Sequence, residues 1–192
     1  MHLIVGLGNP GPEYRRNRHN AGFMLVERLA RMRRGEFRYF AGADSLVCRT
    51  RTGGLEALLA KPLTYMNRSG LAVRELTARE NVSNRDLLVA YDEAALELGR
   101  IRIRPSGSAG GHQGMQSVID CLGTGEVPRL RIGVGQGPPG REMTDWVLSD
   151  FRKSEEAVLD EALERAAEAV EEFLSNGIDS AMALYNMNPP KD

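Results

Sequence analysis

Candidates for acid–base chemistry are few, because the 192-residue chain contains only three histidines. Histidine is the side chain whose charge changes near neutral pH. His19 lies in a polar stretch where a base could meet a substrate, whereas His2 opens an apolar run and is expected to be structural or exposed. Asp92 follows another apolar run and is the carboxylate best placed to hold the His19 ring. Such a partner makes the free ring nitrogen more basic, so the pair predicts a general base for water. The alternative is a loop histidine bonded to a nearby carbonyl group.

Three side-chain amides, those of Asn9, Asn67 and Gln113, fall in loops after expected strands or before expected helices. Each amide offers a donor and an acceptor, which suits it to hold an amide or ester and to position water. For any one of them alone, turn formation or helix capping is the ordinary role. Convergence of all three would favour a substrate site.

A glycine-rich turn, from Gly6 to Gly11, fits the G-x-G-x-x-G pattern of dinucleotide-binding folds. That motif requires a helix to begin inside the turn, so that its free N–H groups face a pyrophosphate. Here Pro10 and Pro12 delay the helix, whose first period starts only near Asn20. In addition, no second strand ends in an acid at the expected distance. The sequence therefore disfavours a dinucleotide site.

Two other chemistries lack their sequence patterns. His19, Asp92 and His112 could form a metal site, but they have no ligand spacing such as H-x-x-x-H. Ser108 lies in a Gly-Ser-Ala-Gly stretch without the G-x-S-x-G pattern of a nucleophilic serine. We therefore expect no metal, no cofactor and no serine nucleophile.

The length and composition predict one domain over residues 1–192. With 42% hydrophobic residues, the chain can form one sizeable core and is short for two. No hydrophobic run is long enough to span a bilayer, and the amino terminus lacks a secretory pattern, so we expect a cytoplasmic protein without a membrane partner. Cys48 and Cys121 match no metal or redox spacing and are expected to be free buried thiols.

The formal net charge of −1 hides an uneven distribution, since the first 150 residues are basic and residues 151–175 are acidic. Residues 100–104 alternate arginine with isoleucine, and residues 129–132 repeat the arrangement with leucine and isoleucine. A strand with this pattern buries the aliphatic side chains and presents the guanidinium groups on its other face. Such a face is either an ordinary solvated surface or a grip for phosphates, with candidates Arg102, Arg104 and Arg131.

The first half of the chain predicts a buried strand at residues 2–5 and a helix from Asn20 toward Met32, with the asparagine as its cap. Residues 45–50 and 55–60 are expected to pair as a hairpin about Gly53-Gly54. Because Pro62 cannot sustain a central strand, residues 61–67 are predicted to be a loop. A helix capped by Asn67 or Ser69 then runs to about residue 81.

In the second half, residues 87–91 form a second buried strand that delivers Asp92 at its carboxyl end. The carboxylate is level with the end of the first strand if the two strands are parallel. Helices are expected at 115–122 and at about 154–175, the latter strongly amphipathic. Because strands and helices alternate, we expect an α/β fold: a single domain with a mixed, mostly parallel sheet and helices on both faces.

Several motifs occur in order over the first three quarters of the chain. They are IVGLGNPG at 4–11 with Tyr14, RHNAG at 18–22, KP at 61–62 through YMN at 65–67 with SG at 69–70, DE at 92–93, GSAGGH at 107–112 with Gly114, and RLRIG at 129–133. Together they resemble the motifs of the bacterial peptidyl-tRNA hydrolases.

The resemblance implies a monomeric, metal-free esterase that cleaves the bond between a peptide and the terminal ribose of tRNA and so recycles tRNA. By position, His19 is similar to the base that activates water, and Asp92 to the group that stabilises its basic form. Asn9 is similar to the residue that distinguishes N-blocked from free aminoacyl-tRNA. The residues expected to bind substrate or tRNA are Tyr14, Tyr65, Asn67, Gln113, Arg104 and Arg131.

The chain departs from the family pattern at a few positions. Gln113 stands where the family usually has asparagine, Gln116 where lysine is frequent, and Ala94-Ala95 where Leu-Asp is usual. The extra methylene of Gln113 bears on how substrate is held more than on the type of reaction. The alternative function is an RNA-binding relative without catalysis, although such a role would not require His19, Asp92 and the amides together.

Overall fold

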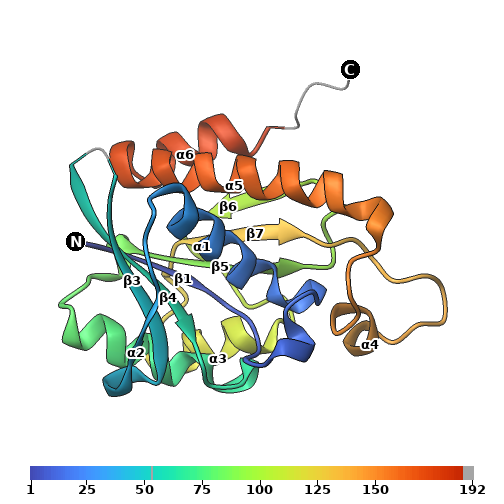
Figure 1. Ribbon diagram of the computed structural model, residues 1–192, viewed down its shortest axis with the longest axis horizontal. Helices are drawn as coiled ribbons and strands as arrows, with labels where there is room; N and C mark the ends of the chain where they lie inside the picture. Colours follow the sequence, from blue (N-terminus) through green and yellow to red (C-terminus); the bar gives the residue numbers. More distant parts are fainter. Residues whose placement is uncertain (53, 188–192) are drawn as a thin grey trace.

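The computed structural model describes residues 1–52 and 54–187, so Gly53 of the predicted hairpin turn lies outside the described residues. The centre of the molecule is a seven-stranded sheet in the order β2-β3-β4-β1-β5-β7-β6 (Figure 1). The strands are β1 His2–Gly6, β2 Arg38–Phe40, β3 Ser45–Thr52, β4 Leu55–Pro62, β5 Leu87–Glu93, β6 Ile101–Arg104 and β7 Arg129–Gly133. The α-helices are α1 Ala21–Met32, α2 Ser69–Arg79, α3 Gln113–Leu122, α4 Met143–Val147, α5 Glu156–Asn176 and α6 Ile178–Tyr185.

The four central strands, β4, β1, β5 and β7, run parallel, and the outer strands β3, β2 and β6 run antiparallel to their neighbours. In the pairing of β1 with β5, Leu3 lies opposite Leu87 and Gly6 lies opposite Ala90. Asp92 therefore lies just beyond the carboxyl end of β1, as predicted. The predicted fold class, a mixed and mostly parallel sheet with helices on both faces, is confirmed.

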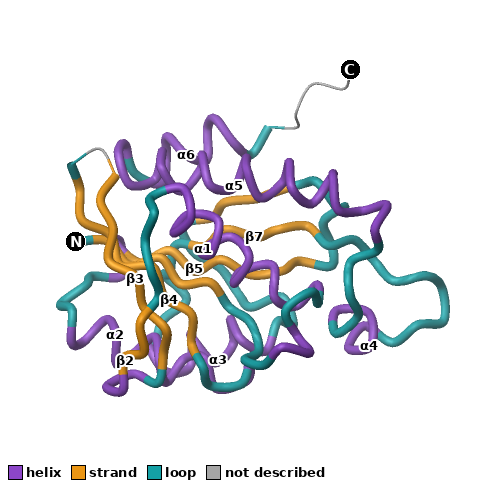
Figure 2. Tube along the Cα trace, viewed as in Figure 1, coloured by secondary structure: helices purple, strands orange, loops and turns teal. Residues whose placement is uncertain are grey.

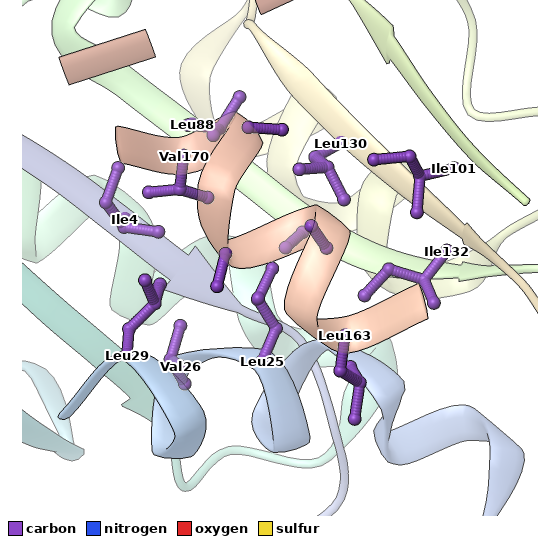
Figure 3. Close-up of a cluster of buried hydrophobic side chains, with 14 of the residues drawn as sticks. Ile4, Leu25, Val26, Leu29, Leu88, Ile101, Leu130, Ile132, Leu163 and Val170 are labelled. Carbon is purple, nitrogen blue, oxygen red and sulfur yellow. The ribbon is translucent and has the colours of Figure 1, made fainter. Parts of the chain in front are cut away.

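Helices α1, α5 and α6 cover one face of the sheet, and α2 and α3 cover the other (Figures 1 and 2). Because successive side chains of a strand point to opposite faces, each central strand contributes to both cores. Ile4 of β1 packs with α1 and α5, while its neighbours Leu3 and Val5 pack with α2 and α3. Figure 3 shows Leu25 of α1 and others of the first core meeting over the strands. The two cores hold the strand ends in fixed positions.

The predicted loop at 61–67 is partly wrong, because β4 continues through Lys61 and Pro62. The pairing of β4 with β1 ends at Ala60, so no neighbour on that side requires an N–H group from Pro62. On its other side Pro62 lies opposite Ser45 of β3. The proline therefore occupies the strand end without breaking the central pairing.

The predicted helix caps are also wrong. Asn20 precedes α1, but its side chain bonds to the backbone of Asn9 rather than to the helix. Neither Asn67 nor Ser69 caps α2. Instead, the hydroxyl group of Ser117 in α3 accepts a hydrogen bond from the Gly70 N–H at 3.0 Å. The free N–H of α2 is thus satisfied from a neighbouring helix, a contact that local sequence does not reveal.

Strand β2 and the short α-helices α4 and α6 were not predicted, and neither were the 3-10 helices. Among the described residues, no helix is both long enough and apolar enough to cross a membrane.

Candidate active site

The candidate site lies at the carboxyl ends of β1 and β5. Asn9 follows β1, Asp92 lies in β5, and His19 lies in a short 3-10 helix, η2 (Arg18–Asn20), that leads into α1. A Cβ atom at Gly22 would lie 2.3 Å from the carbonyl oxygen of Ala90. Only a glycine therefore allows the start of α1 to approach the strand end so closely, and this approach brings His19 next to Asp92.

One oxygen of Asp92 joins two histidines. Nδ1 of His19 lies 2.8 Å from Oδ1 of Asp92, and Nε2 of His112 lies 2.9 Å from the same oxygen. The backbone N–H of Met115 donates to Nδ1 of His112 at 3.1 Å, so its Nε2 carries the proton and donates to Asp92. With His19 likewise donating through Nδ1, its Nε2 is left as the free basic nitrogen.

The Asp92 carboxylate is almost fully buried, at 3% exposure. Burial raises its pKa, but the hydrogen bonds that the N–H groups of His112 and His19 donate to it act in the opposite direction. The net result is a pKa well below the ordinary value of an aspartate. The carboxylate is therefore ionised at neutral pH and accepts both N–H groups through one oxygen.

Sequence reasoning placed His112 only in a possible metal set and missed its bond to Asp92. The sequence signal for this histidine is its position immediately before α3, at the end of a glycine-rich loop. A side chain at that position can cap the helix, which fixes the orientation of the ring. His19, Asp92 and His112 do meet, with their potential ligand atoms within 4.8 Å of one another. In this structure the shared Asp92 oxygen accepts two N–H groups instead.

Asn9 is held with a defined orientation. Its Oδ1 accepts from the Met66 N–H at 2.9 Å, while its own N–H and carbonyl oxygen bond to the amide of Asn20 at 2.9 and 3.0 Å. Because Oδ1 is committed to the backbone, the Nδ2 group is the part of the amide left for another partner. Asn9 is buried, at 8% exposure, and lines the same cavity as His19.

A cavity of about 510 Å³ opens over these groups. Of the predicted site residues it brings together six: Asn9, His19, Tyr65, Asn67, Asp92 and Gln113. Ala94 and Ala95 line it as well, together with an apolar wall from α4 and the residue after it, made of Met143, Val147 and Leu148. One side of the cavity is therefore polar, with an imidazole, a carboxylate and amides, and another side is apolar.

Three predicted residues lie outside this cavity: Tyr14, Arg104 and Arg131. Tyr14 lies in the short 3-10 helix η1, Pro12–Tyr14. Arg131 donates to the carboxylate of Glu93 at 3.0 Å, and Glu93 is itself a lining residue. In the β6–β7 pairing Arg102, not Arg104, lies opposite Arg131. Arg131 thus lies next to a lining residue, whereas Arg104 lies on the outer strand β6 opposite Arg129.

The repeated pattern on β7 predicted an outward arginine face, either solvated or phosphate-binding, but the side chain of Arg129 is buried at 1% exposure. It donates to the carbonyl groups of Val127, Gly107, Ser108 and Gly125. These bonds fix the loop that leads to His112. The alternation of arginine with aliphatic residues is the same for a buried and an exposed guanidinium group, so the pattern could not distinguish them.

A second buried arginine, Arg18, precedes His19 in η2 and fixes the turn that carries the histidine. It has no exposed surface, and it donates to both carboxylate oxygens of Glu155 at 2.8 and 2.6 Å and to the Asp150 carbonyl at 2.7 Å. Its guanidinium group also packs over the rings of Trp146 and Phe151, 3.8 and 4.8 Å from their centres. The arginine therefore ties the histidine turn to α4 and to the start of α5.

Comparison with known proteins gives one consistent result. The family model described as peptidyl-tRNA hydrolase matches residues 3–192. The chain is 50% identical to a peptidyl-tRNA hydrolase of Symbiobacterium thermophilum, with 96% of this chain and 98% of that protein covered. It is 45% identical to one of Elusimicrobium minutum, with the same coverage. A crystal structure of peptidyl-tRNA hydrolase from Acinetobacter baumannii superposes with a TM-score of 0.93 at 32% identity, covering 100% of this chain and 97% of that one. On its sequence and its fold alike, the chain belongs to the peptidyl-tRNA hydrolase family.

Proposed function

We propose that this protein hydrolyses the ester that joins a peptide, or an N-blocked aminoacyl group, to the terminal ribose of tRNA. The observation that carries the proposal is the oxygen of Asp92 shared by His19 and His112, because it leaves Nε2 of His19 free beside a cavity lined by amides. Family membership supports the same reaction and disfavours the RNA-binding alternative without catalysis.

In the proposed reaction, Nε2 of His19 takes a proton from a water molecule as the water oxygen attacks the ester carbonyl carbon. The imidazolium that forms is stabilised by the ionised Asp92, while the tetrahedral intermediate carries the negative charge on its oxygen. Collapse of the intermediate breaks the bond to the ribose oxygen, which takes the proton from His19. The products are a peptide carboxylate and tRNA with a free hydroxyl group.

Asn9 supports discrimination between blocked and free substrates. Its Nδ2 is the group left for a ligand, and an N–H donor attracts the carbonyl oxygen of a peptide bond but repels a free ammonium group. Tyr65, Asn67 and Gln113 line the cavity and are proposed to hold the acylated end of the tRNA. The longer Gln113 side chain reaches further than an asparagine from the same backbone position.

Tyr14, Arg104 and Arg131 are proposed to contact tRNA outside the cavity, the arginines through its phosphates. We further propose that the enzyme works as a monomer in the cytoplasm, where peptidyl-tRNA is produced. The charge asymmetry of the sequence supports a polyanionic partner, since the basic residues precede the acidic segment 151–175.

The test is the release of N-acetyl-aminoacyl groups from tRNA by the wild type and by His19→Ala, with free aminoacyl-tRNA as the control substrate. We expect the wild type to cleave only the blocked substrate and His19→Ala to be slower by at least about a hundredfold. A folded wild-type protein that binds tRNA without cleaving the blocked substrate would contradict the proposal.

A further inference from the structure

The apolar wall of the active-site cavity has no role in the proposed reaction. It consists of Met143, Val147 and Leu148, and the small side chains of Ala94 and Ala95 line the same cavity. Met143 and Leu148 are 51% and 39% exposed, so the wall presents apolar surface to the cavity instead of burying it in a core. Apolar surface in a concave site indicates a ligand with an apolar part.

The wall begins next to the turn that carries His19. Residues 16–18 pair antiparallel with residues 149–151, through an isolated bridge and two backbone hydrogen bonds of 3.0 and 3.1 Å. Continuing this pairing by one residue in each segment brings His19 level with Leu148, and both residues line the cavity. Figure 1 shows α4, which carries the rest of the wall, beside the turn before α1. A group that reacts at His19 therefore lies close to the wall.

The helix α4 is held in place before any substrate binds. Trp146 is buried at 5% exposure, and its Nε1 donates to the Gly135 carbonyl oxygen at 2.7 Å. Its ring also packs against the guanidinium group of Arg18, in the turn that carries His19. A preformed wall loses little conformational freedom when a ligand binds, so it can contribute to the choice of substrate.

Among its described lining residues, the cavity has no charged group left for a substrate side chain. The lining carboxylates are Asp92 and Glu93. Asp92 accepts from two histidines, and Glu93 accepts from Arg131 at 3.0 Å and from the Ala95 N–H at 3.1 Å. Neither lysine nor arginine is among these lining residues. A charged side chain would therefore lose its water here without gaining an ion pair.

We propose that the apolar wall binds the side chain of the amino acid whose ester is cleaved, and that the enzyme prefers aliphatic and aromatic residues at this position. This inference rests on the proposed function. The side chain starts at the carbon next to the carbonyl group that the water attacks, so it must lie close to His19. The same carbon carries the blocked nitrogen, whose acyl group is proposed to lie at Asn9 on the polar side. The wall is the surface left for the side chain, and the cavity of about 510 Å³ has room for both groups.

The test uses one tRNA acylated in turn with four Nα-acetyl amino acids: leucine, alanine, lysine and aspartate. Because the tRNA is the same, differences in kcat/KM report on the side chain. We expect kcat/KM for leucine to exceed that for alanine by at least about tenfold, and the lysine and aspartate substrates to be cleaved more slowly than leucine by a similar or larger factor. Equal values for all four substrates would overturn the inference.

The variant Val147→Thr adds a hydroxyl group to the wall with little change in shape. We expect the ratio of kcat/KM for leucine to that for alanine to fall roughly threefold. The matched control is Val158→Thr, the same change at an exposed residue of α5 outside the cavity lining, which should leave the ratio unchanged. If Val147→Thr slows all four substrates by the same factor, the wall holds a part that they share, such as the terminal adenine, and the inference is wrong.

The variant Ala95→Asp tests the same cavity through charge. Ala95 is exposed, and its bond to Glu93 is made by its backbone and survives the change. A carboxylate at this position attracts a lysine side chain and repels an aspartate. The ratio of kcat/KM for lysine to that for aspartate should therefore rise by at least about tenfold. Ala95→Asn, which has the same shape without the charge, should change this ratio less than about twofold.

An unchanged ratio of lysine to aspartate in Ala95→Asp would show that the side chain does not enter the cavity, and would contradict the inference. Failure of the proposed function is a different result, because the wild type would then cleave none of the four substrates. Failure of the side-chain site leaves all four cleaved, without a preference among them.

Discussion

At the scale of single residues, the site depends on a buried negative charge. Asp92 remains ionised in spite of its burial because two imidazole groups bond to one of its oxygens. In the proposed reaction its effect is indirect, since it holds the His19 ring and stabilises the imidazolium that forms during proton transfer. The same interactions contribute to the stability of the fold, because they exist only in the folded state.

This linkage predicts how stability depends on pH. The pKa of Asp92 is lower in the folded protein than the value of about 3.9 for an unfolded chain. Its contribution to stability is therefore fully present above about pH 4 and is lost as the pH falls toward the folded-state pKa. We expect Asp92→Asn to be less stable than the wild type at pH 6, and the difference to narrow below about pH 4. Urea unfolding at pH 6 and below about pH 4 measures this difference in the free energy of unfolding. A difference that widens at low pH would contradict the lowered pKa of Asp92.

At the scale of elements, His19 is positioned by groups that never touch the cavity. Gly22 allows the close approach of α1 to the strand ends, and Arg18 joins the histidine turn to α4 and to the beginning of α5. α4 in turn supplies part of the apolar wall of the cavity. The position of His19 and the shape of the cavity are thus linked through one buried guanidinium group.

Two ion pairs that are adjacent in the sequence test the role of Arg18: the buried Arg18–Glu155 pair is the test, and the exposed Arg16–Glu156 pair is its control. Arg18 and Glu155 have side-chain exposures of 0% and 20%, whereas Arg16 and Glu156 are exposed at 59% and 52%. Glu155→Gln leaves a buried guanidinium group without its charge partner and should lower the free energy of unfolding by on the order of 3 kcal/mol. Glu156→Gln should cost less than about 0.5 kcal/mol. Thermal and urea unfolding measure both, and equal effects would show that Arg18 is not the buried anchor inferred here.

At the scale of the whole molecule, the sequence predicts those strands and helices whose apolar residues follow a regular local period. The apolar runs of β1 and β5 indicated the parallel sheet, and the position of Asp92 after such a run placed it near His19. The bond of His112 to Asp92, the burial of Arg129 and the cap of α2 by Ser117 were not predictable in this way. Each depends on a partner distant in the sequence, and the same residue types occur in exposed loops and strands. The identity of such partners follows only from the packing of the completed sheet and helices.

The central claim is that Asp92 acts through His19, and a double-mutant cycle of His19→Ala and Asp92→Asn tests it most directly. The kcat for an N-blocked aminoacyl-tRNA is measured for the wild type, the two single variants and the double variant, each shown to be folded by circular dichroism. Groups that act as a unit are strongly non-additive. We expect each single change to lower kcat by at least about a hundredfold, and the double variant to be no slower than His19→Ala alone. A double variant whose loss equals the product of the two single losses would show that the carboxylate and the base act independently, and would contradict the account.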